Sequence, residues 1–136
     1  MVNGVILDTD TLSFVLRGDE AVINALMDVI DEHGFVSISA ITCYEAFAGL
    51  HFKDAKRKLS ELQQLVAINR VIPFGKKEAE RAGTIRGTLR RAGITIGHLD
   101  IMIAATALEH NLIVITNNLK HFGHIPELQY KTWVNS

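Results

Sequence analysis

The chain has 136 residues, of which 48% are hydrophobic and 21% charged, a composition that excludes a disordered protein and fits one domain spanning residues 1–136. A single cysteine excludes an internal disulfide framework. No run approaches the roughly 20 hydrophobic residues of a membrane helix, and the first residues lack the features of a signal peptide, so we expect a cytoplasmic protein. The net charge of −1 hides an uneven distribution of charge along the chain. Residues 1–50 hold eight acidic and one basic residue, whereas residues 53–91 hold eleven basic and four acidic ones.

Short apolar runs alternate with helical patterns in the first half of the chain. Strands are predicted at 5–7 and 35–39, and helices at 11–16, at 19–32 and around Glu45. Ser39 or Thr42 could cap the helix that contains Glu45.

The second half continues the alternation. Strands are predicted at 71–74 and 112–116 with a possible edge strand at 128–133, and helices at 53–68, 76–92, 98–110 and 119–122. Because the strands are apolar on both sides, we expect an α/β fold whose parallel sheet is covered on both faces.

Three acidic residues lie in unusually apolar surroundings. Asp8 follows the run Val5-Ile6-Leu7, Glu45 lies within residues 41–47, and Asp100 lies within residues 99–105. A carboxylate moved out of water loses several kcal/mol unless a positive charge compensates. No Lys, Arg or His lies at helical pairing distance to serve all three. If the three acids converge, a divalent cation is the simplest way to offset their repulsion.

Each acid also has a purely structural interpretation. Asp8 could cap the following helix, although Asp10 could do so equally well and leave Asp8 free. Glu45 could be an ordinary exposed side chain, but its helical neighbours offer no partner for a carboxylate. Asp100 lies in the first turn of its helix, where the dipole favours negative charge by up to about 2 kcal/mol.

Helical winding strengthens the functional interpretation of Asp100. At 100° per residue, the helix at 98–110 places its polar residues, Thr106 among them, on one side and Asp100 on the apolar side. The dipole alone is too small to offset the desolvation of a carboxylate there.

Other polar residues give weaker signals. Thr116, Asn117 and Asn118 follow the fourth strand and could orient a water or a metal, or could simply form a turn. His121 and His124 have a spacing that zinc could use, but without a second ligand pair they fit surface histidines better.

Four segments together resemble the PIN-domain nucleases, most closely the VapC-type toxin branch. They are Val5-Ile6-Leu7-Asp8-Thr9-Asp10, Ser39–Glu45, Gly93–Ala105 and Val114–Phe122, in the order and spacing of that family. The resemblance covers nearly the whole chain. It implies a three-layer α/β/α fold with a mainly parallel central sheet, a homodimer and a cognate antitoxin protein.

The resemblance also implies an activity and its site. Asp8, Glu45 and Asp100 would be the catalytic, metal-binding carboxylates of an endoribonuclease that depends on Mg²⁺ or Mn²⁺. Asn118 stands where a fourth acid is common, which weakens the case for a second tightly held metal. Thr9, Thr116 and Asn118 are expected to orient ligands or water.

The basic half of the chain suits a polyanionic substrate such as RNA. Candidates for phosphate contacts are Lys53, Lys56, Arg57, Arg86, Arg90 and Arg91, which would make RNA binding sensitive to salt. The alternative is that long surface helices are simply rich in Lys and Arg.

Two other functions compete with a nuclease. Asp8-Thr9-Asp10-Thr11 is similar to the start of haloacid-dehalogenase phosphatases, in which Asp8 would be the nucleophile, although no later acidic Gly-Asp pair follows. A catalytically inactive PIN fold could instead serve as a binding module. The apolar helices at 19–32 and 53–68 could form a dimer or antitoxin groove, or could simply pack in the core.

Overall fold

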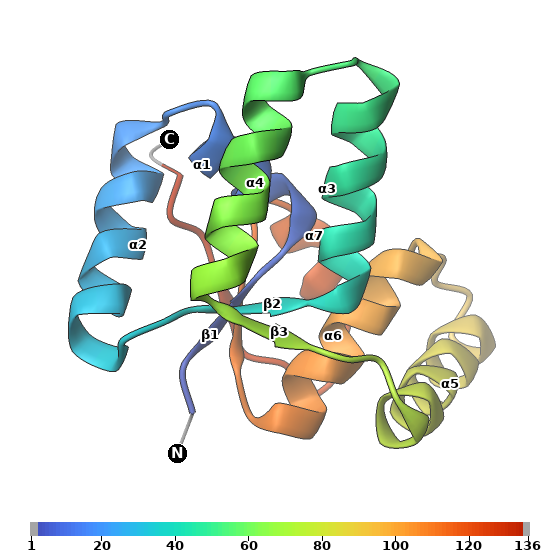
Figure 1. Ribbon diagram of the computed structural model, residues 1–136. Helices are drawn as coiled ribbons and strands as arrows, with labels where there is room; N and C mark the ends of the chain where they lie inside the picture. Colours follow the sequence, from blue (N-terminus) through green and yellow to red (C-terminus); the bar gives the residue numbers. More distant parts are fainter. Residues whose placement is uncertain (1–2, 135–136) are drawn as a thin grey trace.

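A five-stranded sheet, in which every pair of neighbouring strands is parallel, forms the centre of the molecule (Figure 1). The computed structural model describes residues 3–134, and the strand order is β3-β2-β1-β4-β5. The strands are β1 (Val5–Leu7), β2 (Ser37–Ser39), β3 (Arg70–Ile72), β4 (Ile113–Ile115) and β5 (Tyr130–Lys131). The predicted parallel sheet is therefore confirmed, including its edge strand near the end of the chain.

The described chain contains helices between all consecutive strands. They are α1 (Thr9–Leu16), α2 (Glu20–His33), α3 (Ala40–Phe52), α4 (Lys56–Ile68), α5 (Lys76–Arg91), α6 (His98–His110) and α7 (Leu119–Phe122). Within residues 3–134, none of these helices combines the length and apolar character needed to cross a bilayer.

One helix begins later than the sequence pattern predicts. The expected helix at 53–68 starts at Lys56, because Lys53 is the C-cap of α3 and Asp54 turns the chain with a φ of 50°. Residues 53–55 thus connect two helices, and their placement in the α4 pattern was wrong.

The sheet buries two hydrophobic clusters, one on each face. Ile6 and Val114 face the cluster built with α5, α6 and α7, whereas Leu7 and Ile115 face the cluster covered by α2 and α4. Successive side chains of a strand point to opposite faces, so adjacent residues of β1 and β4 supply both clusters. The expected three-layer α/β/α architecture follows directly from this alternation.

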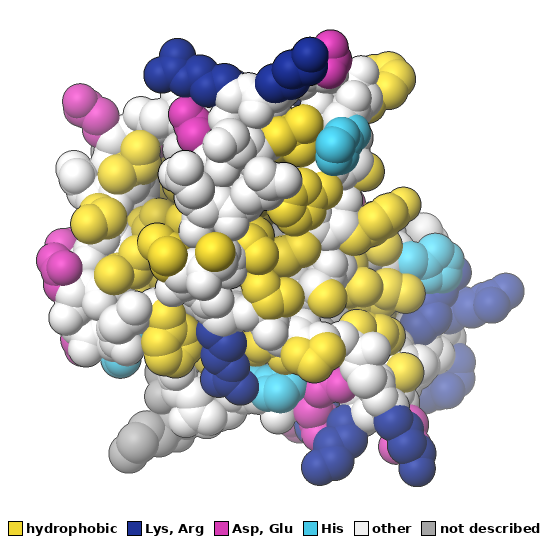
Figure 2. All heavy atoms as spheres, viewed as in Figure 1, with side chains coloured by type: hydrophobic (Ala, Val, Ile, Leu, Met, Phe, Trp, Pro, Cys, Tyr) yellow, Lys and Arg dark blue, Asp and Glu magenta, His cyan; other side chains and the backbone are white. Residues whose placement is uncertain are grey.

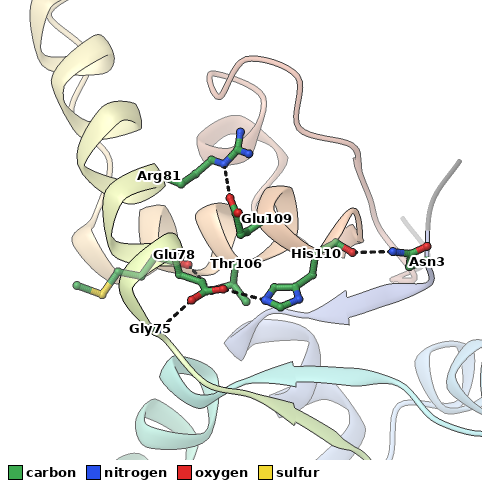
Figure 3. Close-up of polar contacts among 8 residues, drawn as sticks. Asn3, Gly75, Glu78, Arg81, Thr106, Glu109 and His110 are labelled. Carbon is green, nitrogen blue, oxygen red and sulfur yellow. Dashed lines mark hydrogen bonds and ion pairs between the residues drawn. The ribbon is translucent and has the colours of Figure 1, made fainter.

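Polar contacts join the start of α5 to the end of α6 (Figure 3). Glu78, only 7% exposed, accepts a hydrogen bond from the Gly75 N–H at 2.8 Å and contacts His110 Nε2 at 2.9 Å. Burial would raise the pKa of Glu78, but hydrogen bonds from the Gly75 and Glu78 backbone and from His110 together hold that pKa below its ordinary value. Arg81 pairs with Glu109 at 3.0 Å nearby. The two helices therefore run antiparallel, and the end of α5 lies beside the start of α6.

Candidate metal centre

The three predicted carboxylates come together at one pocket of about 210 Å³. The pocket is lined by Asp8, Thr9, Asp10, Glu45, Asp100 and Asn118. Asp8 follows β1, Glu45 lies on the helix that follows β2, and Asn118 lies beyond β4. Because β2, β1 and β4 are neighbours in a parallel sheet, their carboxyl ends deliver these side chains to the same edge.

Asp8 is the most deeply buried of the three acids, with 3% of its surface exposed. Its backbone N–H donates to the Ile115 carbonyl at 3.0 Å, and its Oδ1 accepts a hydrogen bond from the Thr11 N–H at 2.8 Å. Asp8 therefore caps α1 itself, and of the two candidates for this cap it is the one that the structure uses. Although Oδ1 caps the helix, the Asp8 side chain also lines the pocket.

The surroundings of Asp8 disfavour its negative charge. Burial raises the pKa of its carboxyl group, while hydrogen bonds from Thr116 and Thr11 oppose the rise only in part, and the charge of Asp10 adds to it. The net direction is upward. A cation in the pocket would reverse this balance, because it would stabilise the ionised form.

Glu45 is tied to the first turn of α1. The Thr9 hydroxyl donates a short hydrogen bond to Glu45 Oε1, across 36 positions of sequence. Ser39 caps α3 by accepting from the Thr42 N–H at 3.0 Å, which fixes the start of the helix that carries Glu45. Glu45 is thus half-buried and held, in contrast to an ordinary exposed glutamate.

Asp100 lies at the rim of the pocket. Its side chain is 28% exposed, and its Oδ2 lies 3.2 Å from His121 Nδ1. The placement of Thr106 on the polar side of the helix was wrong, because Thr106 is fully buried and its hydroxyl donates to the Met102 carbonyl. Helix α6 is buried on most of its sides, so winding alone could not locate the position of Asp100.

The loop after β4 completes the pocket. Thr116 is fully buried and its Oγ1 accepts a hydrogen bond from the Asn118 N–H at 2.8 Å. The Asn118 amide nitrogen lies 2.7 Å from His121 Nδ1. Sequence reasoning treated His121 as a surface residue, and the one signal that could have placed it is its spacing of three from Asn118.

The pocket suits a hard divalent cation. Its lining offers carboxylate, hydroxyl and amide oxygens, the ligands that Mg²⁺ and Mn²⁺ prefer, and includes no Lys or Arg. Within residues 3–134, no group of three or more His, Cys, Asp or Glu side chains is arranged so that it could hold a metal ion by itself, and an ion in this pocket would need further ligands from water. The donors therefore fit an ion that keeps several water ligands, as Mg²⁺ does.

The candidate phosphate-binding residues fall into two groups. Lys53, Lys56 and Arg57 are exposed near the α3–α4 connection. Lys53 follows Glu45 by eight residues, a helical rise of about 12 Å along α3. Arg57 also pairs with Glu61 at 3.6 Å. The other group, Arg86, Arg90 and Arg91, lies in the second half of α5, at the end of the helix pair where Asp100 also lies. Arg86 lines a groove between α5 and α6, and Arg90 and Arg91 are exposed.

Comparisons with known proteins agree with this arrangement. The chain is 30% identical over 128 residues to the tRNA(fMet)-specific endonuclease VapC of Salmonella typhimurium. The aligned residues make up 93% of this chain and 96% of that relative. Its structure resembles VapBC2 from Rickettsia felis bound to a promoter DNA fragment, with a TM-score of 0.88 and 26% identity over 96% of this chain and 99% of the other. It also resembles DNA-bound VapBC from Salmonella typhimurium, with a TM-score of 0.87 and 30% identity over 98% and 100% of the two chains. The PIN domain family matches residues 5–128, nearly the whole sequence, and the chain belongs to that family.

Proposed function

We propose that this protein is a divalent-metal-dependent endoribonuclease and the toxin of a toxin–antitoxin pair. The convergence of Asp8, Glu45 and Asp100 on one pocket is the observation that carries the proposal. The names of the relatives, which include ribonuclease VapC and tRNA(fMet)-specific endonuclease, support RNA as the substrate class. At the coarser level, the chain is a nuclease that hydrolyses phosphodiester bonds.

In this proposal each residue of the pocket has a distinct role. Asp8, Glu45 and Asp100 would hold Mg²⁺ or Mn²⁺, and the ion would supply positive charge near the scissile phosphate and lower the pKa of a bound water. Thr9 orients Glu45 through its hydroxyl, and Thr116 orients Asp8 and the Asn118 loop. These hydrogen bonds limit the rotation of the Asp8 and Glu45 side chains before substrate arrives, so little reorganisation is needed during reaction.

Removal of the metal tests this function. We expect EDTA to abolish cleavage of a labelled RNA by the wild-type protein, and Mn²⁺ or Mg²⁺ added in excess of the chelator to restore it. Gel separation of the products would also show whether cleavage is internal. Full cleavage in EDTA would contradict the proposal, and absence of cleavage with either metal across several RNA classes would favour an inactive binding module. Membership of the PIN family leaves no observation in favour of a phosphatase with Asp8 as nucleophile.

The basic end of α5 is proposed to contact the RNA backbone. The double variant Arg90→Gln/Arg91→Gln should weaken RNA binding and reduce the slope of log K against log salt by about 0.7 for each phosphate that is no longer neutralised. Fluorescence anisotropy in EDTA at several salt concentrations measures both quantities. Arg70→Gln, at the exposed start of β3, is the matched control. If the double variant and Arg70→Gln bind RNA equally weakly, the proposal that α5 contacts the RNA backbone would be wrong.

We propose that the hydrophobic face over α2, α3 and α4 serves protein partners. Figure 2 shows hydrophobic side chains gathered on this face. The exposed large hydrophobic residues of these three helices include Met27 at 49%, Tyr44 at 63%, Phe52 at 91% and Ile68 at 70%. Such a surface exceeds what a solvated helix needs. The similar structures are VapBC assemblies, which supports a cognate antitoxin and a homodimer as the occupants.

A further inference from the structure

The imidazole of His121 touches two residues of the candidate metal centre and is not among the residues that line its pocket. We propose that His121 is a positioning residue, which holds the Asp100 carboxylate and the Asn118 amide in the orientation that receives the divalent cation. This inference rests on the proposed function, because it presupposes that a cation binds in the pocket.

A single ring nitrogen makes both contacts. His121 Nδ1 lies 3.2 Å from Asp100 Oδ2 and 2.7 Å from the Asn118 amide nitrogen. A ring nitrogen either carries a proton and donates, or has a lone pair and accepts. A carboxylate can only accept, so the contact with Asp100 requires a proton on Nδ1.

This requirement also determines the orientation of Asn118. With a proton on Nδ1, the Asn118 amide is stable only when its oxygen, rather than its nitrogen, faces the ring, and the two amide atoms exchange places by a simple flip. One N–H group then faces two oxygens, Asp100 Oδ2 and Asn118 Oδ1. Asn118 Oδ1 has a second lone pair, which the N–H group does not use and which remains for the cation or its waters. His121 would thus fix the orientation of two side chains that line the pocket.

The backbone of His121 is well placed to act as a fixed support. Its neighbour Phe122 is fully buried in the cluster beneath α6, and the Phe122 N–H donates to the Asn118 carbonyl at 3.3 Å. The short helix α7 therefore cannot shift without disturbing the core. Removal of a side chain that hydrogen-bonds to a metal ligand typically lowers metal affinity or activity by 10–100-fold.

Two amide substitutions separate this role from a general structural one. Asn at position 121 places its amide near the position of Nδ1, whereas Gln extends toward that of Nε2. We expect His121→Gln to weaken Mn²⁺ binding by about tenfold or more and His121→Asn to stay within about threefold of wild type. His124→Ala, at an exposed residue of the same segment, should leave affinity unchanged. Mn²⁺ alone is titrated into the full-length protein and followed by electron paramagnetic resonance, and circular dichroism verifies folding.

The kinetics provide a second readout. His121→Gln should lower kcat for RNA cleavage at saturating Mn²⁺ with little change in KM, because the ring contacts ligands of the metal rather than RNA. Equal Mn²⁺ affinities of wild type and His121→Gln, or equal reductions in the Gln and Asn variants, would overturn the inference. A wild-type protein that binds Mn²⁺ without cleaving RNA would overturn the proposed function and leave the affinity comparison decisive for His121. A wild-type protein that binds no Mn²⁺ would overturn both.

Discussion

Replacement of Asp100 by Asn should lower the rate of RNA cleavage by at least about a hundredfold without unfolding the protein. Asn has the same shape but lacks the charge that holds a cation, and a metal ion contributes several kcal/mol to stabilising the charge of a phosphoryl transition state. A loss of about 3 kcal/mol already corresponds to more than a hundredfold in rate. The side chain is 28% exposed at the pocket rim, so the substitution leaves no buried cavity. Single-turnover cleavage of a labelled RNA, with purified wild type alongside, measures the effect.

Controls make this experiment specific to the pocket. Asp28→Asn removes one charge from the exposed face of α2 and should cleave at the wild-type rate. Glu45→Gln should reproduce the Asp100 defect, and Asp10→Asn would decide whether the fourth pocket acid contributes, since Asp10 lines the pocket but is exposed. Unimpaired cleavage by Asp100→Asn would remove the proposed site.

Replacement of Asp8 by Asn should have opposite effects on stability with and without metal. Burial raises the pKa of Asp8, so the folded state binds its proton more tightly than the unfolded state. In the metal-free protein, stability therefore falls as the pH rises from the ordinary value of 3.8 through the raised pKa. Asn cannot ionise but still caps α1. Metal-free Asp8→Asn should thus melt above wild type at neutral pH, and the difference should shrink as the pH falls through that window.

Added metal should reverse the order of the two proteins. A ligand at about 100 times its Kd stabilises the folded state by about 2.7 kcal/mol, which corresponds to a rise in Tm of roughly 10 °C for a chain of this size. Wild type should show this rise with Mn²⁺, and Asp8→Asn should show little of it. Differential scanning fluorimetry with EDTA or Mn²⁺ measures both effects. A metal-induced rise of equal size in the two proteins would exclude Asp8 as a ligand.

The sequence predicted that three acids would converge, but it did not predict their surroundings. Asp8, Glu45 and Asp100 could be found because each interrupts an apolar segment, and a parallel sheet brings segments that follow its strands to one edge. The contacts of His121 with Asp100, of Thr9 with Glu45 and of Glu78 with His110 join residues 21 to 36 positions apart. A local sequence pattern cannot predict such contacts, because they depend on how the helices pack against one another and on the sheet.

Helix α6 illustrates a second limit. A helical wheel assumes one buried and one exposed side, and it therefore placed Thr106 with the solvent-facing residues. Thr106 is instead fully buried, because α6 is enclosed by the sheet, α5 and α7, and the hydroxyl is satisfied by the backbone of its own helix. The start of the helix predicted at 53–68 was wrong for a related reason, since an amphipathic pattern does not show where one helix stops and the next begins.

The hydrogen bonds that join Glu78 to Gly75 and to His110 affect which parts of this nuclease can change in sequence. These contacts hold the C-terminal end of α6, which lies about 20 Å along the helix from its first residue and away from Asp100. The connection at 92–97 then does not have to hold Asp100 in place. Exposed residues of that connection can therefore be exchanged while Asp100 keeps its place at the pocket.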